Sequence, residues 1–118
     1  MKQGVILFAH GSRDPEWARP FEAICAVLAR ELPAAIVSVA YLEAMRPSLP
    51  EAVAALRGVD TIRVVPVFFG YGGHVKEDLP RLVSTLQAAH PDVRITLAKP
   101  IGEDPAVVEA IARAIARG

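Results

Sequence analysis

Two histidines stand beyond apolar, strand-like runs of the sequence. His10 directly follows the run at 4–9, and His74 lies five residues after the run at 61–69 ends. Neutral imidazole is the commonest ligand for borderline divalent metals in proteins, and it is also a base near neutral pH. A carboxylate, Glu43, ends a third such run. These three side chains form a candidate metal-handling set if the fold brings the ends of the runs together.

Strand-like and helix-like segments alternate along the chain. The expected strands cover 4–9, 35–43, 61–69 and 93–98, and the expected helices cover about 15–32, 49–57, 78–89 and 105–117. This alternation predicts an α/β fold, a three-layer sandwich with a four-stranded parallel sheet and helices on both faces. For a small doubly wound sheet we expect the strand order 2-1-3-4. The first and third strands are then neighbours, and a crevice opens between their carboxyl ends.

Local signals mark several element boundaries. The segment SLPE at 48–51 is a capping-box pattern, and Asp104 is placed to cap the last helix. Pro20 either kinks the first helix or begins its main part, and we expect Pro80 in the first turn of the third helix. Pro66 lacks the backbone donor of a central strand residue, which suggests a bulge or an edge-like step.

The loop FFGYGGHVKEDLP, at 68–80, has glycines before a helix but lacks both the Walker spacing and the GxGxxG pattern of a phosphate cradle. Glu77 and Asp78 would also repel an anion at that helix start. We interpret Gly72 and Gly73, together with Gly70, as positions where the backbone turns sharply and a flat, bulky ligand approaches closely. A simple flexible turn is the alternative.

Composition narrows the class of protein. The chain has 118 residues, 53% of them hydrophobic, and 13 basic residues balance 13 acidic ones. A neutral chain has no overall field that recruits nucleic acid or an anionic membrane, so we expect neither as a partner. The only cysteine, Cys25, excludes an intrachain disulfide. The apolar runs are too short for a signal peptide or a membrane span, so we expect one cytoplasmic domain covering 1–118.

The sequence resembles the short-form sirohydrochlorin cobalt/iron chelatases, the CbiX type of the class II tetrapyrrole chelatase family. The resemblance covers essentially the whole chain. It is carried by AHGSRDP (9–15), YLEAMRPSL (41–49), VVPVFFGYGGHVKEDLP (64–80) and AKPIGEDP (98–105). The first and third motifs are specific when they occur together at this separation. The resemblance implies a chelatase-like half domain, because longer relatives carry two such halves in one chain.

The resemblance also implies an activity, the insertion of Co²⁺ or Fe²⁺ into sirohydrochlorin for cobalamin or siroheme synthesis. It implies that His10 and His74 handle the metal, that Glu43 assists, and that the short members are homodimers. The chemistry fits these residues, because metalation removes two pyrrole protons while the ion sheds water, and imidazoles can hold the ion and then accept protons. We expect no organic cofactor, and the metal is a substrate.

Basic residues on the predicted rim are candidates for binding the eight carboxylates of sirohydrochlorin. Arg13, Arg46 and Lys76 lie in the expected rim loops. Ordinary solvated surface charge is the alternative for each of them. Trp17 and Phe21 could form an apolar wall for the ring, and core packing is the alternative there.

Two other functions remain open at this point. A non-catalytic carrier of a tetrapyrrole or metal would need the same groups. A flavodoxin-like nucleotide-binding or receiver-type module would need a phosphate loop or an acidic cluster after the first strand, where this chain has His10. The residue types do not select among Co²⁺, Fe²⁺ and Ni²⁺. One half domain offers only a single wall to a large macrocycle, and with the apolar last helix this predicts a homodimer.

Overall fold

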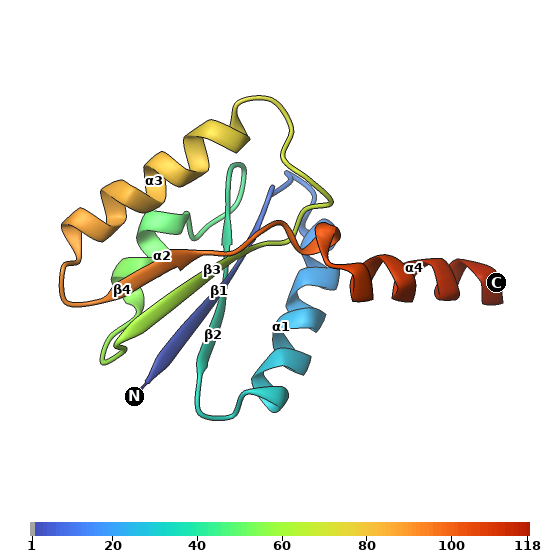
Figure 1. Ribbon diagram of the computed structural model, residues 1–118, viewed down its shortest axis with the longest axis horizontal. Helices are drawn as coiled ribbons and strands as arrows, with labels where there is room; N and C mark the ends of the chain where they lie inside the picture. Colours follow the sequence, from blue (N-terminus) through green and yellow to red (C-terminus); the bar gives the residue numbers. More distant parts are fainter. Residues whose placement is uncertain (1) are drawn as a thin grey trace.

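The computed structural model describes residues 2–118, and its centre is a parallel sheet (Figure 1). The strands are β1 (Gln3–Ala9), β2 (Ile36–Tyr41), β3 (Thr61–Pro66) and β4 (Arg94–Leu97). Their order is β2-β1-β3-β4, with every neighbouring pair parallel. The predicted order is therefore confirmed, and β1 and β3 lie side by side as expected.

A helix follows each strand, so the predicted alternation is also confirmed. The α-helices are α1 (Arg19–Glu31), α2 (Leu49–Ala55), α3 (Val75–Ala89) and α4 (Pro105–Arg117). Two short 3₁₀ helices, η1 (Pro15–Ala18) and η2 (Ile101–Glu103), precede α1 and α4. None of the helices in residues 2–118 is both long and apolar enough to cross a membrane.

The capping signals are formed as the sequence predicts. The Ser48 side chain accepts from the Glu51 N–H, and the Glu51 carboxylate accepts from the Ser48 N–H. Asp104 accepts from the Ala106 N–H at the start of α4. Pro20 is the second residue of α1, directly after η1, so it begins the main helix rather than kinking it.

Three boundary predictions need correction. The helix α3 begins at Val75, so Pro80 lies inside it and not in its first turn. Proline has no backbone N–H to donate to the carbonyl four residues earlier, but that carbonyl belongs to the exposed Lys76, where water can donate instead. Pro66 makes no bulge, because it is the last residue of β3 and the next N–H, from Val67, still bonds to the Phe8 carbonyl. The strand β2 ends at Tyr41, so Glu43 lies two residues beyond it.

Side chains alternate between the two faces of the sheet and build two separate cores. On one face Ile6, Phe8 and Val64 pack against α2 and α3. On the other face Val5, Leu7 and Val65 pack against residues of α1, among them Cys25. Cys25 is thus half-buried in a packed layer, and burial raises the pKa of its thiol.

The helix α4 departs from a simple three-layer arrangement. It points away from the body of its own chain instead of lying along the sheet (Figure 1). All of its residues are exposed except the half-buried Val107. The helix is apolar along one side, and this side is largely exposed: Val108 is 54% exposed and Ile115 is 74% exposed.

Candidate functional site

His10 lies on an aromatic platform at the carboxyl edge of the sheet. Its ring centroid is 4.5 Å from that of Phe68, with the rings tilted by 30°. Phe68 is buried and packs against Phe8 of β1, with centroids 5.9 Å apart. The imidazole itself is exposed. The core therefore holds one face of the ring and leaves its other side open to a ligand.

The loop after β1 is joined to the loop after β2. The Glu43 N–H donates to the His10 carbonyl at 3.0 Å, and the Leu42 N–H donates to the Ala9 carbonyl at 2.9 Å. Gly11 has φ of 93°, and a Cβ atom there would lie 1.8 Å from the Glu43 carbonyl oxygen. The glycine after His10 is therefore required by backbone packing, and this packing brings Glu43 next to His10.

Glu43 and His74 line one open cavity at the same edge. The cavity has a volume of about 310 Å³. Its lining is Phe8, Leu42, Glu43, His74, Val75, Asp78, Leu79 and Leu82. An imidazole and two carboxylates thus share an otherwise apolar hollow between the β2 edge loop and the start of α3.

Asp78 is a member of this set that the sequence reasoning assigned only as a repeller of anions. It lies four residues after His74, and its N–H donates to the His74 carbonyl at 2.8 Å. Residues four apart on a helix share one face, so this spacing was the available signal. The spacing predicts a shared face only if the helix begins near His74, whereas we expected it to begin at about residue 78.

His10 lies beside this cavity and is not part of its lining. Phe8 connects the two places, since it lines the cavity and also packs against Phe68 beneath His10. In residues 2–118 no group of three His, Cys, Asp or Glu side chains is arranged to hold a metal ion. The structure thus places the three predicted residues on one rim but does not assemble them as a closed metal site.

The glycine-rich loop leaves free space at the rim. A Cβ atom added at Gly70, Gly72 or Gly73 would meet nothing within 4 Å, and Gly73 has φ of 51°. Tyr71 leaves this loop and packs edge-on against Phe68, with centroids 6.4 Å apart. Burial raises the pKa of the Tyr71 phenol, and the Glu103 carboxylate raises it further. The phenol therefore stays protonated at neutral pH.

The basic residues predicted to bind substrate differ in whether they are already paired with a carboxylate of the protein. Arg46 is engaged by the Glu51 carboxylate, whose pKa its hydrogen bond lowers to about 2. In the described part of the chain, Arg13 and Lys76 make no ion pair. Lys76 lines a second hollow of about 480 Å³ that also contains Tyr71 and Lys99. Lys99 is a basic rim residue that sequence reasoning missed.

The two aromatic residues after the first loop belong to the packed interior. Trp17 stacks on Phe21 at 4.5 Å between centroids and contacts Tyr41 at 6.4 Å. Both are half-buried against a small cluster that includes Ala18 and Met45. The alternative of core packing therefore describes these residues.

Imidazole and carboxylate groups thus lie at the carboxyl edge of a small parallel sheet, which is where open α/β sheets bind their ligands. The family model described as CbiX matches residues 4–118. The sirohydrochlorin cobaltochelatase of Saccharolobus solfataricus is 32% identical over 120 residues, covering 95% of this chain and 92% of that protein. The chain belongs to the CbiX family, and it is an enzyme of the chelatase (lyase) class.

Solved structures agree with this assignment. The putative cobalamin biosynthesis protein CbiX of Marinobacter aquaeolei VT8 has a TM-score of 0.83 and 36% identity, covering 98% of this chain and 95% of that one. The sirohydrochlorin chelatase SirB of Bacillus subtilis subspecies spizizenii, in complex with cobalt, has a TM-score of 0.83 and 28% identity. The match covers 99% of this chain but only 51% of the SirB chain. SirB is therefore about twice as long as this chain.

Proposed function

We propose that this enzyme inserts a divalent metal, with Co²⁺ as the first candidate and Fe²⁺ as the second, into sirohydrochlorin for cobalamin or siroheme synthesis. The observation that carries the proposal is the sharing of one open cavity by His74 and Glu43, next to His10 on its Phe68 platform. The name of the Saccharolobus relative and the cobalt bound by SirB support the choice of reaction and metal.

In this proposal His10 and His74 hold the incoming ion and then accept the two pyrrole protons. Imidazole suits both tasks, because it binds Co²⁺ and Fe²⁺ in its neutral form and gains a proton near neutral pH. A site with few protein ligands leaves positions on the ion for the ring nitrogens, so the ion can be transferred. Glu43 and Asp78 offset the charge of the ion and can relay protons to solvent.

Substrate binding is assigned to the open rim. Gly72 and Gly73 let the flat ring approach the backbone, and Lys76 and Arg13 pair with its carboxylates. Lys99 joins them, since it shares a hollow with Lys76. Arg46 is the weakest member of the predicted set, because a substrate carboxylate must first displace Glu51.

We further propose that residues 1–118 act as one chelatase-like half and that two copies form the working enzyme. A single sheet edge faces only one side of a macrocycle. The length of SirB, about twice that of this chain, supports a second half in the complete site.

Timed absorbance of sirohydrochlorin with Co²⁺ and, under anaerobic conditions, with Fe²⁺ tests the proposed reaction. An enzyme gives many product molecules per chain, whereas a carrier stops at a stoichiometric change. Competition among Co²⁺, Fe²⁺ and Ni²⁺ in the same assay identifies the preferred ion. No turnover with any of the three ions would contradict the proposal.

A further inference from the structure

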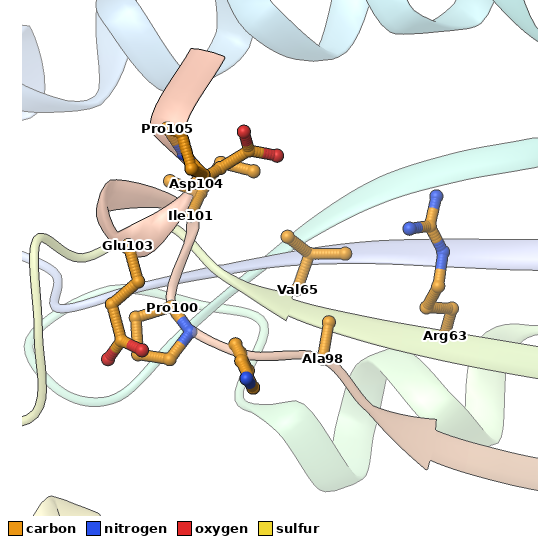
Figure 2. Close-up of a pocket in the computed structure, with 9 residues that line it drawn as sticks. Arg63, Val65, Ala98, Pro100, Ile101, Glu103, Asp104 and Pro105 are labelled. Atoms are coloured by element: carbon orange, nitrogen blue, oxygen red, sulfur yellow. The ribbon is translucent and has the colours of Figure 1, made fainter. Parts of the chain in front are cut away.

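Half of one sheet face has no helix of its own chain lying on it. On the face that carries Val65, α1 packs with the core residues of β1 and β2, while the β3–β4 side forms a hollow of about 400 Å³. Figure 2 shows Val65 and Ala98 on its floor, with Arg63 toward one end and the segment Pro100–Pro105 around the other. In a doubly wound sheet this is the place of the helix that follows the last strand.

The helix that could fill this hollow is α4, but in the structure it leads away from its own sheet. The Gly102 N–H donates to the Phe68 carbonyl at 2.8 Å, which attaches η2 to the exit of β3. A Cβ atom at Gly102 would lie 2.3 Å from the Phe69 Cα, so this contact is close. Asp104 then caps α4 in its outward direction (Figure 1).

The helix α4 has an apolar stripe along one side and charged residues along the opposite side. Val108 and Ile115 belong to the stripe, and Ile111, at 36% exposure, lies between them. Glu109 and Arg113 pair on the opposite side. This amphipathic pattern belongs to a helix that lies against a surface.

A matching apolar surface borders the hollow. Ile24 and Val27, on the flank of α1, are 45% and 47% exposed. Ile24 also lines an apolar cavity with Val67 and Ile101, which locates this flank on the β3 side of α1. Val107 and Ile111, in the first two turns of the chain's own α4, line the same cavity, so only the later turns of α4 extend beyond it. The chain thus carries both a helix whose outer turns have no partner and an open hollow between α1 and β4.

We propose that two copies of this chain exchange α4, so that each helix lies in the β3–β4 hollow of the other copy, against Val65, Ala98 and the flank formed by Ile24 and Val27. This inference rests on the homodimer of the proposed function and specifies its geometry. A helix of 13 residues is about 20 Å long, and two such helices docked reciprocally bury on the order of 1,000 Å², the area of a specific interface. The extra length of SirB is consistent with a second half that supplies such a helix.

Crosslinking between differently tagged chains tests the exchange. In a Cys25→Ser background, one chain carries Ala98→Cys and the other carries Ala114→Cys. Within one chain Ala114 lies roughly 13 Å further out than Pro105 along an outward helix, so the two positions are beyond the Cα separation of about 7 Å that a disulfide spans. We expect a disulfide-linked dimer that contains both tags only when the two variants are mixed. Its absence after mild oxidation of the mixed dimer overturns the exchange.

A matched pair of substitutions in α4 gives a second measurement. Ile115→Lys places a charge on the apolar stripe, and Ala116→Lys places the same charge on the neighbouring, outward side. Light scattering is expected to show that Ile115→Lys is monomeric and that Ala116→Lys remains dimeric, with circular dichroism confirming that both are folded. A dimeric Ile115→Lys protein overturns the exchange and leaves the homodimer standing. A monomeric wild type overturns both, while turnover in the chelatase assay still decides the reaction.

Discussion

The imidazole of His10 rests on the ring of Phe68, with centroids 4.5 Å apart and a tilt of 30°. Phe68 in turn packs against Phe8 and Tyr71, so the platform belongs to the core and to the glycine-rich loop together. Parallel strands β1 and β3 bring these residues into contact although they lie far apart in the chain. The orientation of the imidazole therefore depends on one aromatic ring.

Replacing Phe68 by Leu should lower the rate of metal insertion about tenfold, because it loosens the orientation of His10 while keeping the position apolar. The matched control is Phe69→Leu, since Phe69 is the neighbouring phenylalanine but is 76% exposed, whereas Phe68 is buried. Initial rates at saturating sirohydrochlorin measure the effect. Equal rates for the two variants would show that the platform does not position the imidazole.

Removal of either proposed metal-handling imidazole should slow metal insertion at least tenfold, the usual contribution of acid–base groups. His10→Ala and His74→Ala are the test variants. His90→Ala is the control, because this histidine caps the far end of α3 and the site does not include it. Steady-state absorbance assays with Co²⁺ give the rates, and wild-type activity in both test variants would refute the assignment.

Gly11→Ala should destabilise the protein by about 2 kcal/mol or more, because the added Cβ collides with the Glu43 carbonyl and φ is positive. Gly70→Ala is the matched control, since nothing lies within 4 Å of its added Cβ. Urea denaturation followed by circular dichroism measures both free energies of unfolding. Equal stability of the two variants would mean that the loops after β1 and β2 are not packed together.

The Arg46–Glu51 pair should make stability depend on pH in acid. Hydrogen bonds from Arg46 and then from the Ser48 N–H lower the pKa of Glu51 from 4.5 to about 2, so the folded protein favours the charged carboxylate. The contribution of the ionised Glu51 to the free energy of unfolding is present above pH 4.5 and is lost as pH falls toward 2. The difference in urea midpoint between wild type and Glu51→Gln should therefore be constant above pH 5 and shrink below pH 4.5. A constant difference down to pH 2.5 would contradict this linkage.

Because Arg46 is paired with Glu51, the proposed substrate-binding residues Arg46 and Lys76 should differ in their effect on substrate binding. Lys76→Gln should raise the KM for sirohydrochlorin several-fold, because Lys76 is free to bind a substrate carboxylate. Arg46→Gln should change KM little, because Glu51 already occupies the arginine. Assays at low and high salt check that the lysine effect is electrostatic. A larger KM effect from Arg46→Gln would reverse the ranking.

Apolar runs and their spacing were enough to predict the strands, their order and the edge on which His10, His74 and Glu43 lie. They were not enough for the start of α3, because Pro80 is tolerated inside a helix where its missing donor faces water. This shift concealed the common face of His74 and Asp78. The direction of α4 was also beyond a periodicity argument, since an apolar stripe does not state which sheet it covers. Arg46 was assigned by loop position, and its partner Glu51 becomes evident only in three dimensions.

The hydrogen bond from the Glu43 N–H to the His10 carbonyl has a mechanical consequence. It joins two neighbouring loops into one rigid unit, whereas His74 follows Gly72 and Gly73, where an added Cβ would meet nothing within 4 Å. Regions with few packed neighbours move at low energetic cost. The carboxyl edge thus has one rigid side, which carries His10 and Glu43, and one side that is more easily displaced, which carries His74. A large, flat ligand can enter by moving the second side while the first keeps the His10 imidazole in place.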